Sequence, residues 1–332
     1  MNALPTLSGL FLKTYLVVSI ISMKTVLLTG GTGLVGRSLT RHLIAKGCKV
    51  IILTRKLPAA TQEQVEYAIW DVASKTIDLQ AIQKADYIIH LAGAGVVDKR
   101  WTDAYKKEIK DSRTQSSALL VATLRNNTNK VKAVISASAI GWYGADVVSA
   151  GKHHHFLETD KAATGFLGET CKLWEESIEP VQQLGIRLVK LRTGIVLSND
   201  GGALAEFTKP IKLGVAGILG NGKQIVSWIH IDDLCRMFIA AIENDLMSGS
   251  YNAVAPEPVS NKTLTLELAK QMKGKFFIPV HVPAFVLQIM LGESSVEVLK
   301  STTVSCEKIR QTGFTFLHPD IENALQQLCK TI

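Results

Sequence analysis

The stretch Leu28-Thr29-Gly30-Gly31-Thr32-Gly33-Leu34-Val35-Gly36 decides the fold of this chain. An apolar, β-rich run, Thr25–Thr29, precedes its glycines, and a stretch of helical period, Leu34–Lys46, follows them. A glycine-rich turn between a strand and a helix lets the backbone approach a pyrophosphate closely, and the first amides of the helix donate to its oxygens. We therefore predict a dinucleotide site formed by Thr29, Gly30, Gly31, Thr32, Gly33, Leu34, Val35 and Gly36.

Strands and helices alternate beyond this turn. The further strand-like runs are nearly all apolar: Val50–Thr54, Val65–Trp70, Tyr87–Leu91, Val131–Ser136 and Arg187–Leu191. Between the later runs lie two long helical stretches, Thr102–Asn126 and Phe166–Leu184, the second closed by Gly185. This pattern is typical of a parallel sheet covered on both faces. The sequence predicts an α/β fold, a doubly wound parallel sheet (Rossmann fold) with a smaller, mostly helical C-terminal lobe.

The 332 residues divide into three expected parts. Residues 1–22 are an N-terminal extension, because the first strand begins just after Met23, which can serve as the start. Residues 23–255 form the dinucleotide-binding domain with insertions for the substrate, and 256–332 a small C-terminal domain. The apolar run over 16–21 is too short to cross a bilayer, which needs about 20 residues, so no membrane span is expected.

Composition excludes several other classes of protein. The formal net charge is +8, but the basic residues are scattered and no nucleic-acid-binding motif is present, so nucleic acid is not an expected partner. Five cysteines, odd in number and never in a Cys-x-x-Cys pair, indicate neither a disulfide framework nor a zinc site. We predict no metal and a cytoplasmic location with reduced thiols; the sequence leaves room for an oligomer.

The end of the second strand favours NADP(H) over NAD(H). An NAD site places an acid there for the ribose hydroxyls, whereas this strand ends Leu53-Thr54-Arg55-Lys56. The Arg55 guanidinium is suited to a 2′-phosphate. The alternative is that Arg55 and Lys56 are solvated turn residues.

Other strand ends offer further cofactor contacts. Asp71 could bond the adenine amino group, although an acid at a strand end is also a common turn former. The small residues after the fourth strand, in Leu91-Ala92-Gly93, admit the adenosine ribose, and Ser136 ends the fifth strand. We predict Asp71, Leu91, Ala92, Gly93 and Ser136 as cofactor-binding residues.

Together with the glycine turn, several motifs resemble those of the atypical extended short-chain dehydrogenase/reductases. The motifs are His90-Leu91-Ala92-Gly93, Lys99-Arg100-Trp101, Ser112-Arg113, Ser136–Gly144, Phe166-Leu167-Gly168-Glu169, Trp174-Glu175, Leu191–Leu197 and Trp228–Leu234. Such proteins are usually catalogued as NAD-dependent epimerase/dehydratase family proteins of the nucleoside-diphosphate-sugar epimerase type, with a C-terminal domain of unknown function. The similarity runs from about Met23 to the end of the chain.

The resemblance implies a catalytic pair that this chain lacks. Members that transfer hydride use a Ser or Thr after strand five, then a Tyr with a Lys four residues later on the next helix. The Lys cation lowers the pKa of the Tyr phenol and holds the nicotinamide ribose. Alignment through Glu175 puts Leu167 and Cys171 at those two positions, and no Tyr-x-x-x-Lys exists anywhere in the sequence.

Two functions therefore stay open. The first is an NADP(H)-dependent oxidoreductase or epimerase of unknown substrate, with Ser138 and Tyr143 as catalytic residues. The second, which the missing pair favours, is a non-catalytic NADP(H)-binding redox sensor or interaction protein. Glu169 and Lys172 are alternative proton donors or a surface ion pair.

A small-molecule substrate is the expected partner. Arg100, Trp101 and Arg113 lie near the start of the helix after the fourth strand, where they are expected to line the mouth of the cleft. A cation beside an aromatic ring suits an anionic or aromatic substrate.

Overall fold

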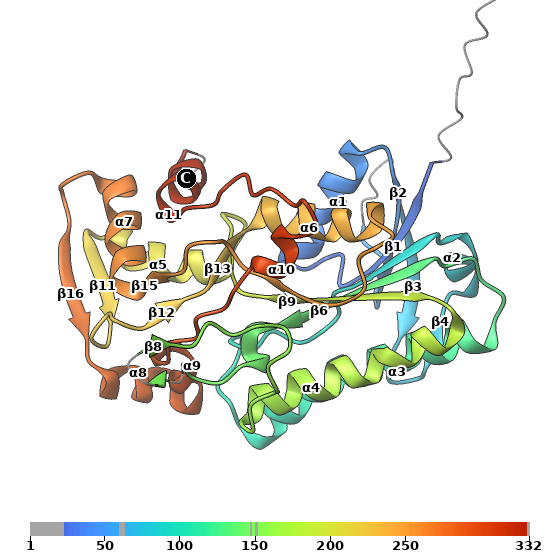
Figure 1. Ribbon diagram of the computed structural model, residues 1–332, viewed down its shortest axis with the longest axis horizontal. Coiled ribbons are helices and arrows are strands. Elements are labelled where there is room, and N and C mark those ends of the chain that lie inside the picture. The colour runs from blue at the N-terminus through green and yellow to red at the C-terminus, as the bar shows by residue number, and fades with distance from the viewer. Residues whose placement is uncertain (1–22, 60–63, 147, 150–151, 331–332) are drawn as a thin grey trace, which may run out of the picture.

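The computed structural model describes residues 23–59, 64–146, 148–149 and 152–330. The predicted extension over 1–22 lies outside these residues. An eight-stranded sheet in the order β14-β9-β6-β5-β1-β2-β3-β4 forms the centre (Figure 1). Its strands are β1 (Thr25–Thr29), β2 (Lys49–Thr54), β3 (Val65–Asp71), β4 (Thr76–Ile77), β5 (Tyr87–His90), β6 (Ala133–Ala139), β9 (Arg187–Thr193) and β14 (Gly249–Ala253). All neighbours are parallel except β4 against β3, which confirms the predicted Rossmann-type sheet.

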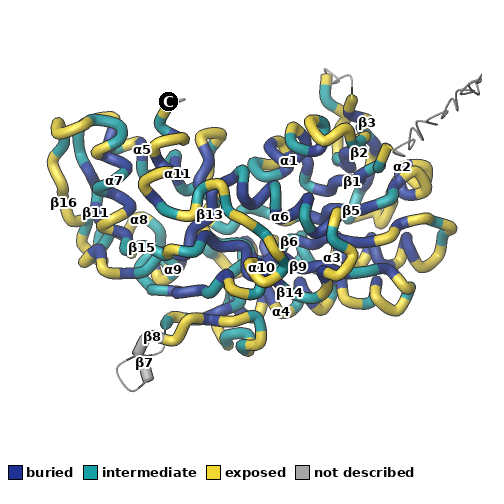
Figure 2. Tube along the Cα trace, turned by 45° about the horizontal axis from the view of Figure 1, so that its top comes forward, coloured by how far each residue is buried: buried dark blue, intermediate teal, exposed yellow. Residues whose placement is uncertain are grey.

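Helices cover both faces of the sheet. One face carries α1 (Leu34–Ala45) and α6 (Ile231–Glu243); the other carries α2 (Leu79–Lys84), α3 (Asp103–Asn126) and α4 (Phe166–Ile178). Alternate residues of β1 supply the two cores, since Val26 and Leu28 pack with α1 and α6 while Leu27 packs with α2 and α3. In Figure 2 the tube is largely dark blue, the colour of buried residues, along these strands. From β1 the chain adds β2 and β3 on one side and then β5, β6 and β9 on the other, so the strand order reverses between β1 and β5. Ligands bind at this switch point in such folds.

Two elements differ most from the sequence prediction. The helix expected over Phe166–Leu184 ends at Ile178 and continues as a 3-10 helix over Glu179–Leu184, because Pro180 has no N–H for the α-helical ladder. Strand β6 begins at Ala133 rather than Val131 and runs on to Ala139. The serines at 136 and 138 therefore lie within the strand.

Residues after β9 form short sheets and helices beside the main sheet. Their elements are β10 (Ile195–Leu197), α5 (Ala203–Lys212), β11 (Val215–Leu219), β12 (Ile225–Val226), β13 (Trp228–His230), β15 (Val259–Ser260), α7 (Asn261–Lys273), β16 (Ile278–Val282), α8 (Ala284–Leu291), α9 (Ser295–Leu299), α10 (Glu307–Arg310) and α11 (Ile321–Cys329). A hairpin of β7 (Val148–Ser149) and β8 (Lys152–His153) precedes α4. A separate core joins α5, α7 and α11. The C-terminal region is mainly helical, as predicted.

The first turn of α6 fastens the C-terminal segment to the main sheet. His230 caps α6 by accepting the Asp232 amide. The fully buried Asp233 carboxylate accepts the amides of Leu317 and His318, each at 2.8 Å, and pairs with Arg236 at 2.7 Å. Residues 317–318 are thereby held across α6 before α11 begins.

Among the residues that the structure describes, no helix combines the length and apolar character needed to cross a membrane.

Candidate functional site

The turn after β1 is shaped by contacts that only glycine permits. A Cβ on Gly36 would lie 2.3 Å from the Gly30 carbonyl oxygen, and one on Gly31 would lie 2.8 Å from the Ile52 side chain. Gly30 has φ +68°, and its Cβ would meet the Leu91 carbonyl carbon at 2.9 Å. The turn is therefore pressed against the start of α1, against β2 and against the end of β5.

The N-terminus of α1 presents backbone donors to solvent. Gly33 is the N-cap residue and makes no side-chain cap hydrogen bond. Thr32 and Gly33 are exposed, and Leu34 and Val35 are half-buried. The Gly33 amide donates to the Gly30 carbonyl at 3.0 Å, so the turn offers an anion the first amides of α1, from Leu34 onward, and the partial positive charge of the helix N-terminus. Arg37, which sequence reasoning missed, donates to the Thr32 carbonyl at 2.7 Å and brings a cation to the turn.

Thr29 fixes the neighbouring strand end rather than facing the open edge. Its buried hydroxyl accepts the amides of Leu91 and Ala92, each at 3.1 Å, and bonds His90 Nδ1 at 2.7 Å. On its other side the His90 ring bonds the Ser117 hydroxyl at 3.1 Å. Burial lowers the pKa of His90 to about 3, so the ring is neutral. These bonds hold the predicted residues Leu91 and Ala92 beside the glycine turn.

Arg55 and Asp71 lie at adjacent strand ends on the far side of the turn. Arg55 is exposed at the end of β2, just after Thr54, whose hydroxyl closes the turn by bonding Lys56. Asp71 ends β3 and accepts the Ala73 amide at 2.9 Å. Hydrogen bonds from Ser74 and Ala73, with a smaller contribution from the Arg55 charge, lower the pKa of Asp71. One oxygen of Asp71 therefore already serves a local turn.

Ser136 and Ser138 lie within β6, the strand next to β5. Both are buried, and the Ser136 hydroxyl donates to the Ala137 carbonyl at 3.0 Å. Ser138 donates to Glu175 Oε1 of α4 at 2.7 Å. The catalytic role predicted for Ser138 stays a prediction, and its hydroxyl is engaged within a buried polar network.

Glu175 and Arg192 form the centre of that network. The Arg192 guanidinium donates to both Glu175 oxygens, at 2.8 and 3.1 Å, and Lys190 lies 3.1 Å from the same carboxylate. Burial acts to raise the pKa of Glu175, but the hydrogen bonds and charge of Arg192 outweigh it and the net shift is downward. Both residues stand in the quoted motifs Trp174-Glu175 and Leu191–Leu197, which was the only signal for them in the sequence.

Tyr143 belongs to the same network. Its side chain is fully buried. The Tyr143 hydroxyl donates a hydrogen bond to Asn252 Oδ1 at 2.7 Å and accepts one from Arg192 Nη1 at 3.0 Å. Burial raises the pKa of Tyr143 to about 12. A phenol in this position is a poor proton donor at neutral pH, so its predicted catalytic role stays a prediction without support from the geometry.

The face of α4 toward β6 carries the two residues aligned with the missing catalytic pair. A Cβ on Gly141 would lie 3.2 Å from Leu167 Cβ and 3.5 Å from Cys171 Sγ. Burial raises the pKa of Cys171 to about 12, so the thiol is neutral. On the outer face Lys172 pairs with Glu176 at 3.8 Å, and the ion pair expected between Lys172 and Glu169 is not formed.

The residues predicted at the cleft mouth have separate partners: Arg100, exposed before α3, lies beside Gly292, where a Cβ would be 3.1 Å from its Nη2. Trp101 packs edge-on against Phe166 of α4, with ring centroids 4.9 Å apart. Lys106 pairs with Glu293 at 2.6 Å, so the turn before α9 lies against α3. Arg113, further along α3, stacks on Trp174 with its Cζ 5.0 Å from the ring centroid. Cations and aromatic rings thus alternate along this side of the molecule.

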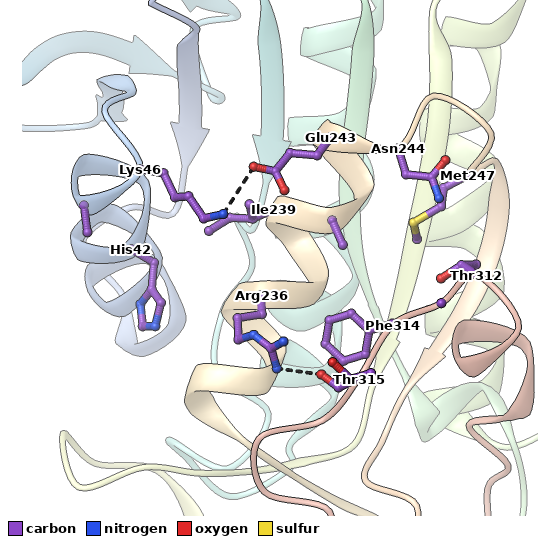
Figure 3. A pocket seen from close by; sticks show the side chains of 13 residues that line it. His42, Lys46, Arg236, Ile239, Glu243, Asn244, Met247, Thr312, Phe314 and Thr315 are labelled. Carbon is purple, nitrogen blue, oxygen red and sulfur yellow. Dashed lines mark hydrogen bonds and ion pairs between the residues drawn. The ribbon is translucent and has the colours of Figure 1, made fainter.

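A separate pocket of about 510 Å³ lies between α1, α6 and residues 312–315 (Figure 3). The Lys46–Glu243 ion pair crosses it, and Arg236 donates to the Thr315 carbonyl at its edge. None of the predicted cofactor or catalytic residues lines this pocket, so it is distinct from the site at the strand ends.

Comparison with known proteins defines the class. Residues 26–253 match the model of the NAD dependent epimerase/dehydratase family, and residues 282–328 match a domain of unknown function, DUF1731. The chain belongs to the NAD dependent epimerase/dehydratase family, of the extended short-chain dehydrogenase/reductase type, as the motifs predicted.

Individual relatives agree over nearly the whole chain. An epimerase family protein of Staphylococcus aureus (strain NCTC 8325) is 34% identical over 309 residues, which cover 93% of this chain and 100% of that protein. The crystal structure of the human epimerase family protein SDR39U1 with NADPH has a TM-score of 0.80 and 26% identity, covering 93% of this chain and 100% of that one. A nucleoside-diphosphate sugar epimerase from Corynebacterium glutamicum has a TM-score of 0.73 and 31% identity, covering 93% of this chain and 58% of that one.

Proposed function

We propose that this protein is an NADPH-dependent oxidoreductase acting on a small molecule. The observation that carries the proposal is the glycine turn, whose shape depends on three missing Cβ atoms and whose helix N-terminus is open to an anion. The human relative of the same family was crystallised with NADPH, which supports this cofactor. A cytoplasmic location stays a prediction.

The residues at the strand ends fit a dinucleotide. Amides at the start of α1 would hold the pyrophosphate, and Leu91 and Ala92, fixed by Thr29, would border the adenosine ribose. The end of β2 carries the exposed cation Arg55 in the place where an NAD site carries an acid. This arrangement supports NADPH over NADH, because a guanidinium forms charge-assisted hydrogen bonds to a 2′-phosphate.

When bound, NADPH supplies a hydride. The chain's own residues would orient the substrate, and Leu167 and Cys171 would present an apolar side chain and a neutral thiol to it from α4. The network of Ser138, Glu175 and Arg192 would hold the end of β6 in place behind the reacting centre. With the aligned Tyr and Lys positions changed, the proton that accompanies the hydride would come from the substrate or from water.

A second candidate is a non-catalytic NADPH-binding sensor. The specific observation in its favour is that the hydroxyls of Ser138 and Tyr143 are both engaged within the buried network. Such a protein would use the cleft for binding alone.

Titration with NADPH and NADH, followed by cofactor fluorescence, tests the cofactor. We expect tighter binding of NADPH; equal or tighter binding of NADH would contradict the role of Arg55. Incubation of the NADPH complex with a panel of aldehydes, ketones and 2-oxo acids then separates the two candidates. Oxidation of NADPH by any member supports the enzyme, whereas binding with no oxidation across the panel favours the sensor.

A further inference from the structure

Arg113 is a cation without a carboxylate partner in the described part of the chain. Its Nη1 donates to the Ile109 carbonyl of its own helix at 2.8 Å, and its guanidinium stacks on Trp174. The titratable groups that interact with its charge are the Cys171 thiol and the Tyr105 phenol, both neutral at pH 7. Burial lowers the pKa of Arg113, so this environment disfavours the charge. By contrast, the buried Arg192 has Glu175 as its partner.

Arg113 lies beside the predicted cofactor residue Gly93. A Cβ on Gly93, just after β5, would lie 3.1 Å from Arg113 Cγ and Cζ and 3.3 Å from Nε. The guanidinium also contacts Trp174 of α4, the helix that carries Cys171, and Cys171 faces Gly141 just after β6. The guanidinium therefore lies between the residues that follow β5 and helix α4, which carries the position aligned with the missing Lys.

A second donor without a partner lies in the same place. Trp174 is 5% exposed, and its Nε1 is buried with no hydrogen-bond acceptor among the described residues. This Nε1 atom belongs to the indole ring that the Arg113 guanidinium contacts. Buried donors are nearly always satisfied, so an orphan donor beside an unpaired cation needs an explanation.

We propose that Arg113 is a specificity-determining residue that binds a carboxylate of the substrate. An arginine cannot shed its proton to escape an unfavourable environment, and a bound anion relieves the penalty of an unpaired charge. Nη1 donates to Ile109, whereas Nε and Nη2 have no acceptor among the residues that the structure describes, and together they form a planar fork. That fork matches the two oxygens of a carboxylate. The inference rests on the proposed function in placing the substrate beside the cofactor.

Titration of a small 2-oxo carboxylate, pyruvate, tests the pocket directly. Binding is followed as the shift in Tm at constant ionic strength, in the free protein and in its NADP⁺ complex, with acetone as the uncharged analogue and inorganic phosphate as the competing anion class. We expect saturable binding of pyruvate, no binding of acetone, and affinity at least about tenfold weaker in Arg113→Gln. Arg113→Lys keeps the charge but loses the fork, so an intermediate loss is expected.

Arg125→Gln is the matched control, because Arg125 is an exposed arginine on the same helix. It should bind pyruvate as the unaltered protein does. No saturable pyruvate binding to the unaltered protein, equal binding by Arg113→Gln, or preference for phosphate would each overturn the proposal. If the protein does not bind NADPH, the proposed function is wrong. Pyruvate binding to the free protein then still tests whether Arg113 binds a carboxylate.

Stability gives an independent readout. Arg113→Met removes a cation that has no partner, so we expect Tm to be unchanged or higher. Arg192→Met removes the two charge-assisted hydrogen bonds of the buried Glu175 carboxylate and leaves it only Lys190 as an ion-pair partner among the described residues, so we expect Tm to fall. A fall for Arg113→Met as large as that for Arg192→Met would overturn the proposal, because it would show that Arg113 is needed by the fold.

Discussion

At the scale of single residues, the choice of cofactor depends on Arg55. Replacing it with Asp puts an acid at the end of β2 and removes the cation proposed for the 2′-phosphate. Charge-assisted hydrogen bonds contribute about 1.5–3 kcal/mol, so we expect NADPH affinity to fall by roughly 10- to 100-fold. NADH affinity should be retained or improved. Fluorescence titration of both cofactors measures this, with Lys49→Asp at the other end of β2 as control; equal losses in the two variants would contradict the assignment.

His90 makes the fold sensitive to acid. Its pKa is lowered from 6.5 to about 3 in the folded protein, so the folded state binds fewer protons than the unfolded state below pH 6.5. The contribution of the neutral His90 ring to the free energy of unfolding is fully present above pH 6.5 and is lost as the pH falls toward 3. One such group lowers the free energy of unfolding by about 2 kcal/mol between pH 7 and pH 5.

His90→Asn removes this titration. Urea denaturation at pH 7, 6 and 5 should show a shallower loss in the variant than in the unaltered protein, whatever the variant's starting stability. Parallel pH profiles for the two proteins would exclude the neutral, buried state of His90.

At the scale of elements, the turn between β1 and α1 is the most constrained segment. Gly36→Ala would place a methyl group 2.3 Å from the Gly30 carbonyl oxygen, within a backbone contact that cannot relax by rotating a side chain. We expect α1 to shift and NADPH binding to be lost or weakened by more than tenfold, with a stability cost of about 1–3 kcal/mol.

Gly165→Ala is the control for this substitution. Gly165 also begins a helix, α4, but a Cβ there would meet nothing within 4 Å, and its φ of −77° suits any residue. It should keep NADPH binding. Cofactor titration with circular dichroism of both variants checks the comparison, and tight NADPH binding by Gly36→Ala would show that the turn does not hold the pyrophosphate.

At the scale of the whole molecule, Asp233 joins the C-terminal segment to the sheet. Asp233→Ala removes the acceptor of two backbone amides, at Leu317 and His318, and leaves Arg236 without its ion pair. Because the carboxylate is fully buried, we expect a loss of about 3–5 kcal/mol and faster amide hydrogen exchange over residues 314–330.

Asp245→Ala is the matched control, since Asp245 pairs with Arg187 on the surface with 87% of its side chain exposed. It should change stability by less than about 1 kcal/mol. Hydrogen exchange followed by mass spectrometry distinguishes the two variants. Unchanged protection over residues 314–330 in Asp233→Ala would mean that α11 holds this segment without the carboxylate.

The sequence by itself determined the class of fold and the place of the cofactor turn. Nearly all-apolar strands alternating with amphipathic helices leave few alternatives to a covered parallel sheet, and the family model over residues 26–253 agrees. The glycine turn was readable for the same reason, because the strand, the turn and the helix that define it are consecutive. The lack of a Tyr-x-x-x-Lys was equally a local fact.

Only the tertiary structure decided what surrounds the reacting centre. The Tyr143 hydroxyl bonds Asn252, 109 residues away, and Ser138 bonds Glu175, 37 residues away, so no spacing in the sequence indicated that either hydroxyl was engaged. Arg113 and Arg192 are both arginines in recognisable motifs, yet Arg192 has a carboxylate partner, whereas Arg113 has none among the residues that the structure describes. Whether a charge is paired depends on which strands and helices pack together. That packing is determined by contacts between residues far apart in the sequence, which form only in the folded chain.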